Sequence, residues 1–261
     1  MRVREMDEFL RHLDPNKREA GSDGLKFGDP EAAITGICIT WMASLNVLQA
    51  AVAKGLNLIC AHEPTFYWDA ADDRDELNLA QIYKTPTQLK TDFLTAHNMA
   101  VIRVRDLWDM FPKYGIQDSW ADAAGLGDVV KAEPHHRVYS TPKQSIGDLA
   151  GRLKKELRLP LVRVVGDLHR SVTLVSVGIG YWGMLHNILA AQRLGAEVHI
   201  AGESMEWQAV RYAEDNRFPL IFAGDSTGHE QGMRNMAVFL GERFRHLKIE
   251  FIPTGDPFSY I

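Results

Sequence analysis

Four short apolar runs of the sequence end in side chains that can bind a metal ion or move a proton. These side chains are His62 and Glu63 after LICA, Arg105, Asp106 and Asp109 after VIRV, Glu203 after HIAG, and Asp225 and His229 after IFAG. Ligands of open α/β sheets bind beyond the carboxyl ends of the strands, where these side chains are expected. Two histidines with several carboxylates suit a hard to borderline divalent cation, so the pattern predicts a metal centre.

Each group also has an interpretation without a metal. The segment His62-Glu63-Pro64 is typical of a turn before a helix. The pair Asp225 and His229 is as typical of a helix N-cap followed by a surface histidine as it is of a pair of metal ligands. Asp109 by itself is uninformative, because an aspartate often caps a helix or accepts backbone hydrogen bonds. The metal hypothesis therefore depends on all four strand ends together.

Strands and helices alternate along the chain in the way that these strand ends require. The helical pattern of residues 3–13 is followed by an apolar run at 33–40 and by a helix that Ser44 can cap and Gly55 can end. Further strands are predicted at 57–61, 99–105, 138–140, 161–166, 171–178, 197–202, 219–224 and 249–253, and further helices through about residue 98 and at 118–127, 145–157, 182–195, 204–216 and 230–247. This alternation predicts an α/β fold with largely parallel sheets.

Residues 50–63 resemble residues 190–203 without a gap. Five positions coincide, namely Ala50 with Ala190, Ala51 with Ala191, Gly55 with Gly195, Ala61 with Ala201, and Glu63 with Glu203. Helix–glycine–strand units often look alike, but both of these end in a glutamate just past the strand. We therefore expect two related α/β lobes, at approximately 1–130 and 131–261.

Composition limits the classes of protein to consider. The 261 residues are 46% hydrophobic and 24% charged, which is typical of a soluble globular protein. A net charge of −5 gives no electrostatic footprint for nucleic acid. Cys38 and Cys60 lie in apolar runs and are expected to be buried thiols. The N-terminal segment lacks the apolar region of a signal peptide, and no run is long enough to span a membrane, so a cytoplasmic protein is expected.

Motifs over nearly the whole chain resemble those of the Nif-three-like family, the dinuclear-metal-centre proteins also named GTP cyclohydrolase type-two homologues. DGLKFGDPE resembles the opening N-G-L segment of the family, LNLICAHEP resembles A-D-L-I-I-x-H-H-P, and MAVIRVRDLWD resembles I-A-V-Y-x-x-H-T-N-L-D. The segment from Gly178 to Glu203 resembles G-G-x-G and the following T-G-E, and IFAGDSTGHEQG resembles the closing G-H-x-x-x-E-x-x-G.

The resemblance implies metal ligands, and this chain departs from the family at several of them. His62 matches the first histidine of H-H-P, whereas Glu63 replaces the second; Asp109 matches the family aspartate, whereas Arg105 replaces a histidine. In the closing motif Asp225 and His229 exchange the two ligand types. The implied ligands are His62, Glu63, Asp109, Asp225 and His229, and their added carboxylates favour Mn, Fe or Mg over Zn. Arg105 would either neutralise these acids or hold an anionic substrate.

The resemblance also implies a single domain, residues 1–261, of two interlocked lobes with mixed, largely parallel sheets meeting at a central cleft. It implies self-association, as in the ring-shaped hexamers of the family. The expected function is hydrolysis of a small anionic or nucleotide-like substrate at a centre of two divalent ions, and the exchanged Asp225 and His229 also allow a centre of one ion. Glu203 is the candidate general base, or else supports the metal ligands. The alternatives are a metal carrier or oligomeric scaffold without turnover, and a degraded site that binds no metal. The substrate and the metal cannot be predicted from the sequence.

Overall fold

The computed structural model describes residues 1–13, 22–67, 84–133, 136–179 and 183–259. The chain folds into two compact units, a first unit of residues 1–111 with 233–254 and a second unit of residues 112–232 with 255–261. Each unit is built on its own mixed sheet, which confirms the predicted α/β class. The predicted division into lobes at about residue 130 stays a prediction.

The first unit contains a sheet of five described strands in the order β1-β4-β3-β2-β11. The edge strand β1 (Gly24–Phe27) is antiparallel to β4 (Ala100–Arg103). The strands β4, β3 (Leu58–Ala61), β2 (Ile37–Thr40) and β11 (Ile249–Phe251) are parallel to one another. Every residue of β2, β3 and β4 is buried, as expected for parallel strands with helices on both faces.

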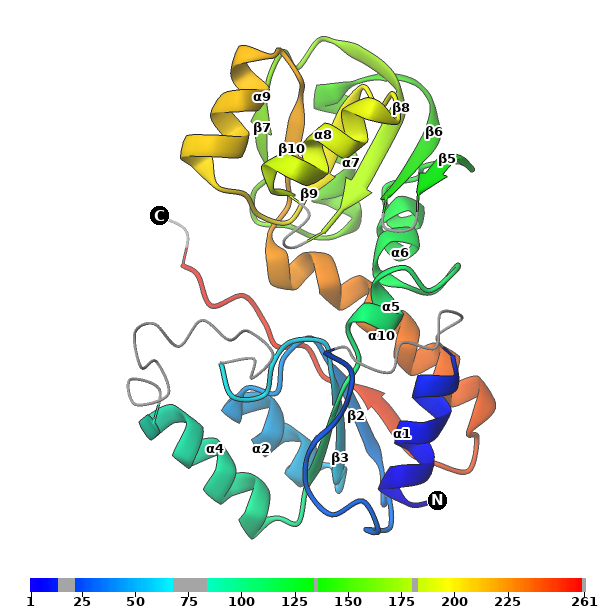
Figure 1. Cartoon of the computed structure of the whole chain (residues 1–261), viewed down its shortest axis with the longest axis vertical. Coiled ribbons are helices and arrows are strands. Elements are labelled where there is room, and N and C mark those ends of the chain that lie inside the picture. The colour runs from blue at the N-terminus through cyan, green and yellow to red at the C-terminus, as the bar shows by residue number, and fades with distance from the viewer. Residues whose placement is uncertain (14–21, 68–83, 134–135, 180–182, 260–261) are drawn as a thin grey trace. The chain divides into compact units, whose positions relative to one another are not determined.

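Helices cover both faces of the first sheet (Figure 1). On one side lie α2 (Leu45–Ala53) and α4 (Lys84–Ala96), whose Leu48 and Leu94 pack into a core with Ile59 and Val101. On the other side lie α1 (Val3–His12) and the later part of α10 (Asp225–Arg243). The short helix α5 (Asp106–Asp109) follows β4 directly.

The second unit contains a sheet of six described strands in the order β5-β6-β8-β9-β10-β7. The parallel strands are β8 (Ser171–Gly178), β9 (Val198–Ala201) and β10 (Leu220–Phe222). Antiparallel strands flank them, with β7 (Arg163–Val165) beside β10, and β6 (His136–Ser145) followed by β5 (Val129–Glu133) beside β8.

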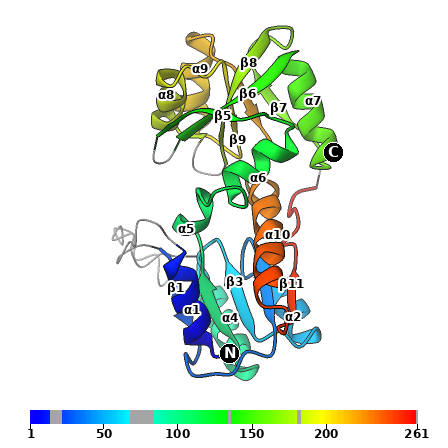
Figure 2. The same ribbon diagram turned by 90° about the vertical axis from the view of Figure 1, so that its right-hand side faces the viewer.

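The helices of the second unit also lie on both sides of their sheet (Figure 2). One side carries α8 (Leu185–Arg193), the π-helical turn η3 (Glu206–Val210) and α9 (Arg211–Asp215), which share an apolar core with β6, β9 and β10. The other side carries α7 (Ile146–Glu156), which Ser145 caps by accepting the Asp148 N–H. The helix α6 (Ile116–Ala123) precedes the sheet in the chain.

Four strands of each unit have the same arrangement. The order β1-β4-β3-β2 of the first unit matches β7-β10-β9-β8 of the second, with the same parallel and antiparallel pairs. The predicted repeat lies within this arrangement, as α2–β3 and α8–β9. Gly55 (φ +72°) and Gly195 (φ +81°) end the two helices in the left-handed conformation that glycine adopts without strain. The two units are therefore related in topology as well as in sequence.

The predicted elements differ from the structure in four places: β1, which lies in a segment predicted to be a loop, β5 and the short helix α5 were not predicted, and the last helix begins earlier than expected. The apolar pattern predicts a helix at 230–247, but α10 spans Asp225–Arg243. The first turn of α10 is polar, so it lacks the apolar periodicity from which the helix was predicted. Its acidic residue favours the N-terminus of a helix. Residues 180–182, which include part of the glycine motif and the first residue of the predicted helix 182–195, lie outside the described residues.

The two cysteines are buried and unbonded, as predicted. Burial raises the pKa of the Cys38 thiol to about 12 and raises that of Cys60 as well. Both thiols are therefore protonated and unreactive at neutral pH. Among the helices that the structure describes, none has the length and apolar character needed to cross a membrane.

Candidate metal centre

His62 directly follows β3, and its backbone is held at that strand end. The N–H groups of His62 and Glu63 both donate to the carbonyl oxygen of Trp41, at 3.0 and 2.9 Å. The His62 side chain is 1% exposed. The turn after the buried strand therefore points an imidazole into the protein, and the predicted histidine ligand lies in an ordered environment.

The His62 ring lies between two carboxylates of the first unit. Its Nδ1 is 2.9 Å from Oε1 of Glu63, and its Nε2 is 2.7 Å from Oδ1 of Asp109. Burial alone would lower the pKa of His62, but the charges and hydrogen bonds of Asp109 and Glu63 outweigh it and raise the pKa to about 10. Without a metal, this histidine is therefore an imidazolium at neutral pH, with a proton on each nitrogen.

The donor chemistry of this pair suits a divalent cation. If a metal replaced the proton on Nε2, His62 Nε2 and Asp109 Oδ1 would be neighbouring ligand atoms, and Nδ1–H would still donate to Glu63. A carboxylate on the second nitrogen of a ligand histidine is common in metal sites, where it fixes the tautomer and the ring orientation. With a metal on Nε2, Glu63 would orient the ring in this way, and the direct ligation by Glu63 that the family motif implies stays a prediction.

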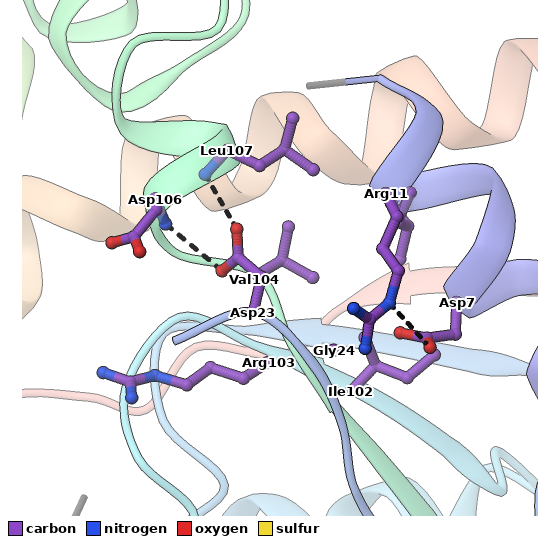
Figure 3. A pocket seen from close by; sticks show the side chains of 10 residues that line it. Asp7, Arg11, Asp23, Gly24, Ile102, Arg103, Val104, Asp106 and Leu107 are labelled. Carbon is purple, nitrogen blue, oxygen red and sulfur yellow. Dashed lines mark hydrogen bonds and ion pairs between the residues drawn. The ribbon is translucent and has the colours of Figure 1, made fainter. Parts of the chain in front are cut away.

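Asp109 is positioned by the helix α5, which Asp23 caps. The Asp23 carboxylate accepts the backbone N–H groups of Arg105, Asp106 and Leu107, the last two at 3.2 and 2.9 Å (Figure 3). Burial raises the pKa of Asp23, although these three hydrogen bonds favour its charged form. An acceptor at the start of a short helix stabilises it by satisfying otherwise unpaired N–H groups. Sequence reasoning missed this role, and only the aspartate of the DGL segment marked the position.

Aromatic packing and a small cavity complete the surroundings of α5. Trp108 is fully buried, stacks on Phe111 at 4.7 Å and contacts Phe239 edge to face at 5.5 Å. A cavity of about 30 Å³ lies between α1, β1, β4 and α5, beside Asp7, Arg11 and Asp23 (Figure 3). This space accommodates about one or two water molecules, so it does not provide a substrate site.

Arg105 does not neutralise the His62–Asp109 pair. Its side chain is 36% exposed and forms an ion pair with Asp106, with Nη1 and Oδ1 3.6 Å apart. A partly exposed ion pair with an adjacent aspartate is weak, and the anion contact expected of Arg105 stays a prediction.

In the second unit, His229 lies one helical turn after Asp225 on α10. It is 4% exposed, and its Nδ1 is 2.8 Å from the backbone carbonyl oxygen of Asp225. A carbonyl oxygen only accepts, so Nδ1 carries the proton and Nε2 is the ligand atom of this histidine. The Asp225 carboxylate also lies near the ring, with Oδ1 3.3 Å from Nδ1. Asp225 therefore orients His229, mainly through its backbone.

Two glycines allow the start of α10 to pack closely within the second unit. A Cβ on Gly228 would lie 2.3 Å from the Ile179 side chain, and one on Gly232 would lie 2.8 Å from the Ile116 Cα. The Trp120 indole N–H also donates to the Gly228 carbonyl oxygen. These contacts fix the helical turn that carries His229, and they give the last glycine of the closing motif a steric role.

Alanine at Gly232 is expected to destabilise the protein by about 1–3 kcal/mol, because the added methyl group meets the backbone of α6. Gly241, on the same helix, is the matched control, since a Cβ there meets nothing within 4 Å. Gly241→Ala is expected to stabilise by up to about 1 kcal/mol through helix propensity. Urea denaturation of both variants measures the difference, and equal effects would contradict the packing argument.

Glu203 follows β9, in the place that Glu63 has after β3. Its side chain is exposed, and its backbone is tightly packed. A Cβ on Gly183 would lie 1.7 Å from the Glu203 carbonyl oxygen, and Ser204 Oγ donates to the Gly183 carbonyl oxygen at 2.6 Å. Glycine is thus required at position 183, and the predicted general base extends from a rigid turn.

The structure thus brings His62, Glu63 and Asp109 together in the first unit, and Asp225 and His229 together in the second. A second residue that sequence reasoning missed is Arg103, the last residue of β4. The only signal of it was a charged residue ending an otherwise apolar run.

Comparisons with known proteins find similar sequences and similar structures. The sequence model of the family described as Duf34/NIF3 (NGG1p interacting factor 3) matches residues 1–257. A relative from Clostridium perfringens named "GTP cyclohydrolase 1 type 2 homolog" is 21% identical over 290 residues, which span 100% of both chains. The Staphylococcus aureus protein SA1388 has a similar structure, with a TM-score of 0.83 at 18% identity over 100% of this chain and 99% of that one. The protein ybgI, described as of unknown function, gives 0.84 at 20% identity over 99% and 100%.

Proposed function

We propose that this chain, which belongs to the Duf34/NIF3 family, binds a divalent metal ion, with His62 and Asp109 of the first unit as ligands and with His229 as the further ligand that the closing motif implies. The observation that carries the proposal is the buried His62, with Nε2 against Asp109 and Nδ1 against Glu63. His229 repeats the pattern of an Nδ1 committed to an acceptor. Two imidazoles and one carboxylate are a common ligand set for Zn²⁺ and Fe²⁺ that leaves coordination positions for water and substrate.

The proposed centre holds one ion, with Glu63 and Asp225 orienting the two histidines. A second ion would need further ligands. Arg105 stands in the place of one family histidine and is not a metal ligand, and the Glu63 carboxylate already accepts a hydrogen bond from His62. The dinuclear arrangement implied by the family motifs is the alternative. Metal stoichiometry distinguishes the two, because one equivalent supports the mononuclear centre and two equivalents support the dinuclear one.

The function that we propose for this centre is hydrolysis of a small anionic or nucleotide-like substrate, a class suggested by the names of the relatives. A bound divalent ion polarises a substrate oxygen and lowers the pKa of a water molecule. In this proposal Arg105 holds an anionic group of the substrate, Glu203 accepts a proton, and Glu63 keeps the His62 ring in place.

A metal carrier or scaffold without turnover is the second candidate. The observation that favours it is the burial of the ligand histidines, 1% exposed for His62 and 4% for His229, which leaves little surface for a substrate to reach. Function depends on the site and not on the fold, so family membership does not decide between the two.

Metal analysis of protein purified without chelator tests the proposal. We expect about one equivalent of a transition metal, either as purified or after reconstitution with Mn²⁺, Fe²⁺ or Zn²⁺. Less than half an equivalent under all of these conditions would contradict it. A screen of phosphoesters and nucleotides then separates hydrolase from carrier. Turnover by the wild type that is lost in His62→Ala supports the hydrolase, and identical rates in the two proteins support the carrier.

A further inference from the structure

Arg103 is a buried cation at the end of an apolar strand. It is the last residue of β4, pairs in register with Ala61 of the parallel strand β3, and is 4% exposed. Burial of a charged group is costly unless polar partners compensate for the lost hydration. A guanidinium group at this position therefore requires an explanation in terms of what it contacts.

One contact of this buried side chain is with the backbone of His62. Nε of Arg103 donates to the His62 carbonyl oxygen at 3.1 Å, in a buried hydrogen bond. The guanidinium group is turned away from Asp23 and Arg11, the charged groups beside the small cavity (Figure 3). Because the His62 N–H donates to Trp41 at the same time, both polar groups of the His62 backbone are held by neighbouring strand ends.

Fixing the backbone of His62 also fixes its ring. The imidazole is attached two bonds from the Cα atom, and its Nε2 must keep its place beside Asp109, which is carried on a different segment of the chain. A displacement of the His62 peptide by a fraction of an ångström would change the relative position of the two ligand atoms. Metal-binding sites lose affinity when the ligand atoms are displaced from one another by this amount.

We infer that Arg103 is a positioning residue of the metal centre, which holds the His62 peptide so that Nε2 stays aligned with Asp109 for a shared cation. The inference rests on the proposed metal-binding function. Arg103 acts through His62 and does not touch the ion. Its positive charge alone would weaken cation binding, so positioning and charge repulsion predict opposite effects when the guanidinium group is removed.

The test compares Arg103→Met, Arg103→Lys and Lys90→Met with the wild type. Lys90 is the matched control because it is also fully buried, and its Nζ donates at 2.8 Å to the carbonyl oxygen of Thr65, three residues after His62. Co²⁺ is the probe, since its visible absorption reports ligand geometry and calorimetry gives its dissociation constant for the metal-free protein.

Arg103→Met is expected to weaken Co²⁺ binding about tenfold to a hundredfold, as is typical for an outer-sphere partner, and to change the visible spectrum. Arg103→Lys, which keeps the charge and one donor, is expected to restore part of the affinity. Lys90→Met is expected to lower thermal stability and leave the dissociation constant and spectrum unchanged.

Unchanged or tighter Co²⁺ binding by Arg103→Met, with the wild-type spectrum, would overturn the inference, and so would an equal loss in Lys90→Met. If Arg103→Met does not fold, Arg103→Lys decides: an intermediate affinity supports the inference, and the full wild-type affinity and spectrum overturn it. If the wild type itself binds no Co²⁺, the proposed metal centre fails, and the role of Arg103 fails with it.

Discussion

His62→Ala is expected to bind Zn²⁺ or Mn²⁺ at least about a hundredfold more weakly than the wild type, a larger loss than removal of an outer-sphere partner causes. The substitution removes the Nε2 atom that lies 2.7 Å from Asp109, and leaves Asp109 and Glu63 without the imidazole between them. Calorimetric titration of metal-free protein measures the loss. Asp109→Asn and His229→Ala test the other two proposed ligands in the same way.

His199→Ala is the control for loss of a buried histidine. His199 is 1% exposed on β9, and its Nδ1 lies 3.1 Å from Ser176 Oγ, within the core of the second unit. This variant is expected to be less stable than the wild type, because a packed polar pair is lost, and to keep the wild-type metal affinity. Equal loss of affinity in His62→Ala and His199→Ala would indicate general loosening of the fold and would contradict the assignment of His62.

Stability and metal affinity are expected to change in opposite directions with pH. Because the pKa of His62 is raised from 6.5 to about 10, its proton stabilises the metal-free fold fully below pH 6.5, and this contribution is lost as the pH approaches 10. A metal must displace the same proton from Nε2. Its apparent affinity is therefore expected to rise about tenfold per pH unit in this range if one proton is released.

Urea denaturation of the metal-free protein, and calorimetry with Zn²⁺, both between pH 6.5 and 9.5, measure the two trends. Lys90 requires a correction, because burial lowers its pKa to about 8 and its contribution to stability therefore rises with pH above that value. The difference in unfolding free energy between wild type and His62→Ala cancels the Lys90 contribution. A pH-independent difference, or a metal affinity that does not change with pH, would contradict the protonated His62.

Local sequence signals predicted most of the fold. Ser44 begins α2 by accepting the Val47 N–H at 3.4 Å, and Gly55 ends it with a positive φ, as their residue types indicated. The parallel strands were marked by continuous apolar runs, because both of their faces are buried. The predicted site residues accordingly lie in the segments that follow β3 and β10.

The remaining features depend on contacts between distant segments. Asp23 caps a helix 83 residues further along the chain, counted to Asp106, and nothing near either residue signals this pairing. Arg103 and Glu63 were visible as residues, but their roles depend on which backbone carbonyl or ring nitrogen they reach. The first turns of α10 pack through Gly228 against the Ile179 side chain and through Gly232 against the backbone of Ile116, contacts that periodicity does not reveal.

The interrupted chain path of the first unit sets an order for folding during synthesis. Its sheet includes β11, which pairs with β2 more than 200 residues earlier, whereas the sheet of the second unit is formed entirely from residues 129–222. A nascent chain emerges from its N-terminus, so the second sheet has all of its strands before the first one does. The sheet that is begun first is thus completed last, and until β11 is synthesised His62 and Asp109 belong to a unit whose sheet lacks one edge.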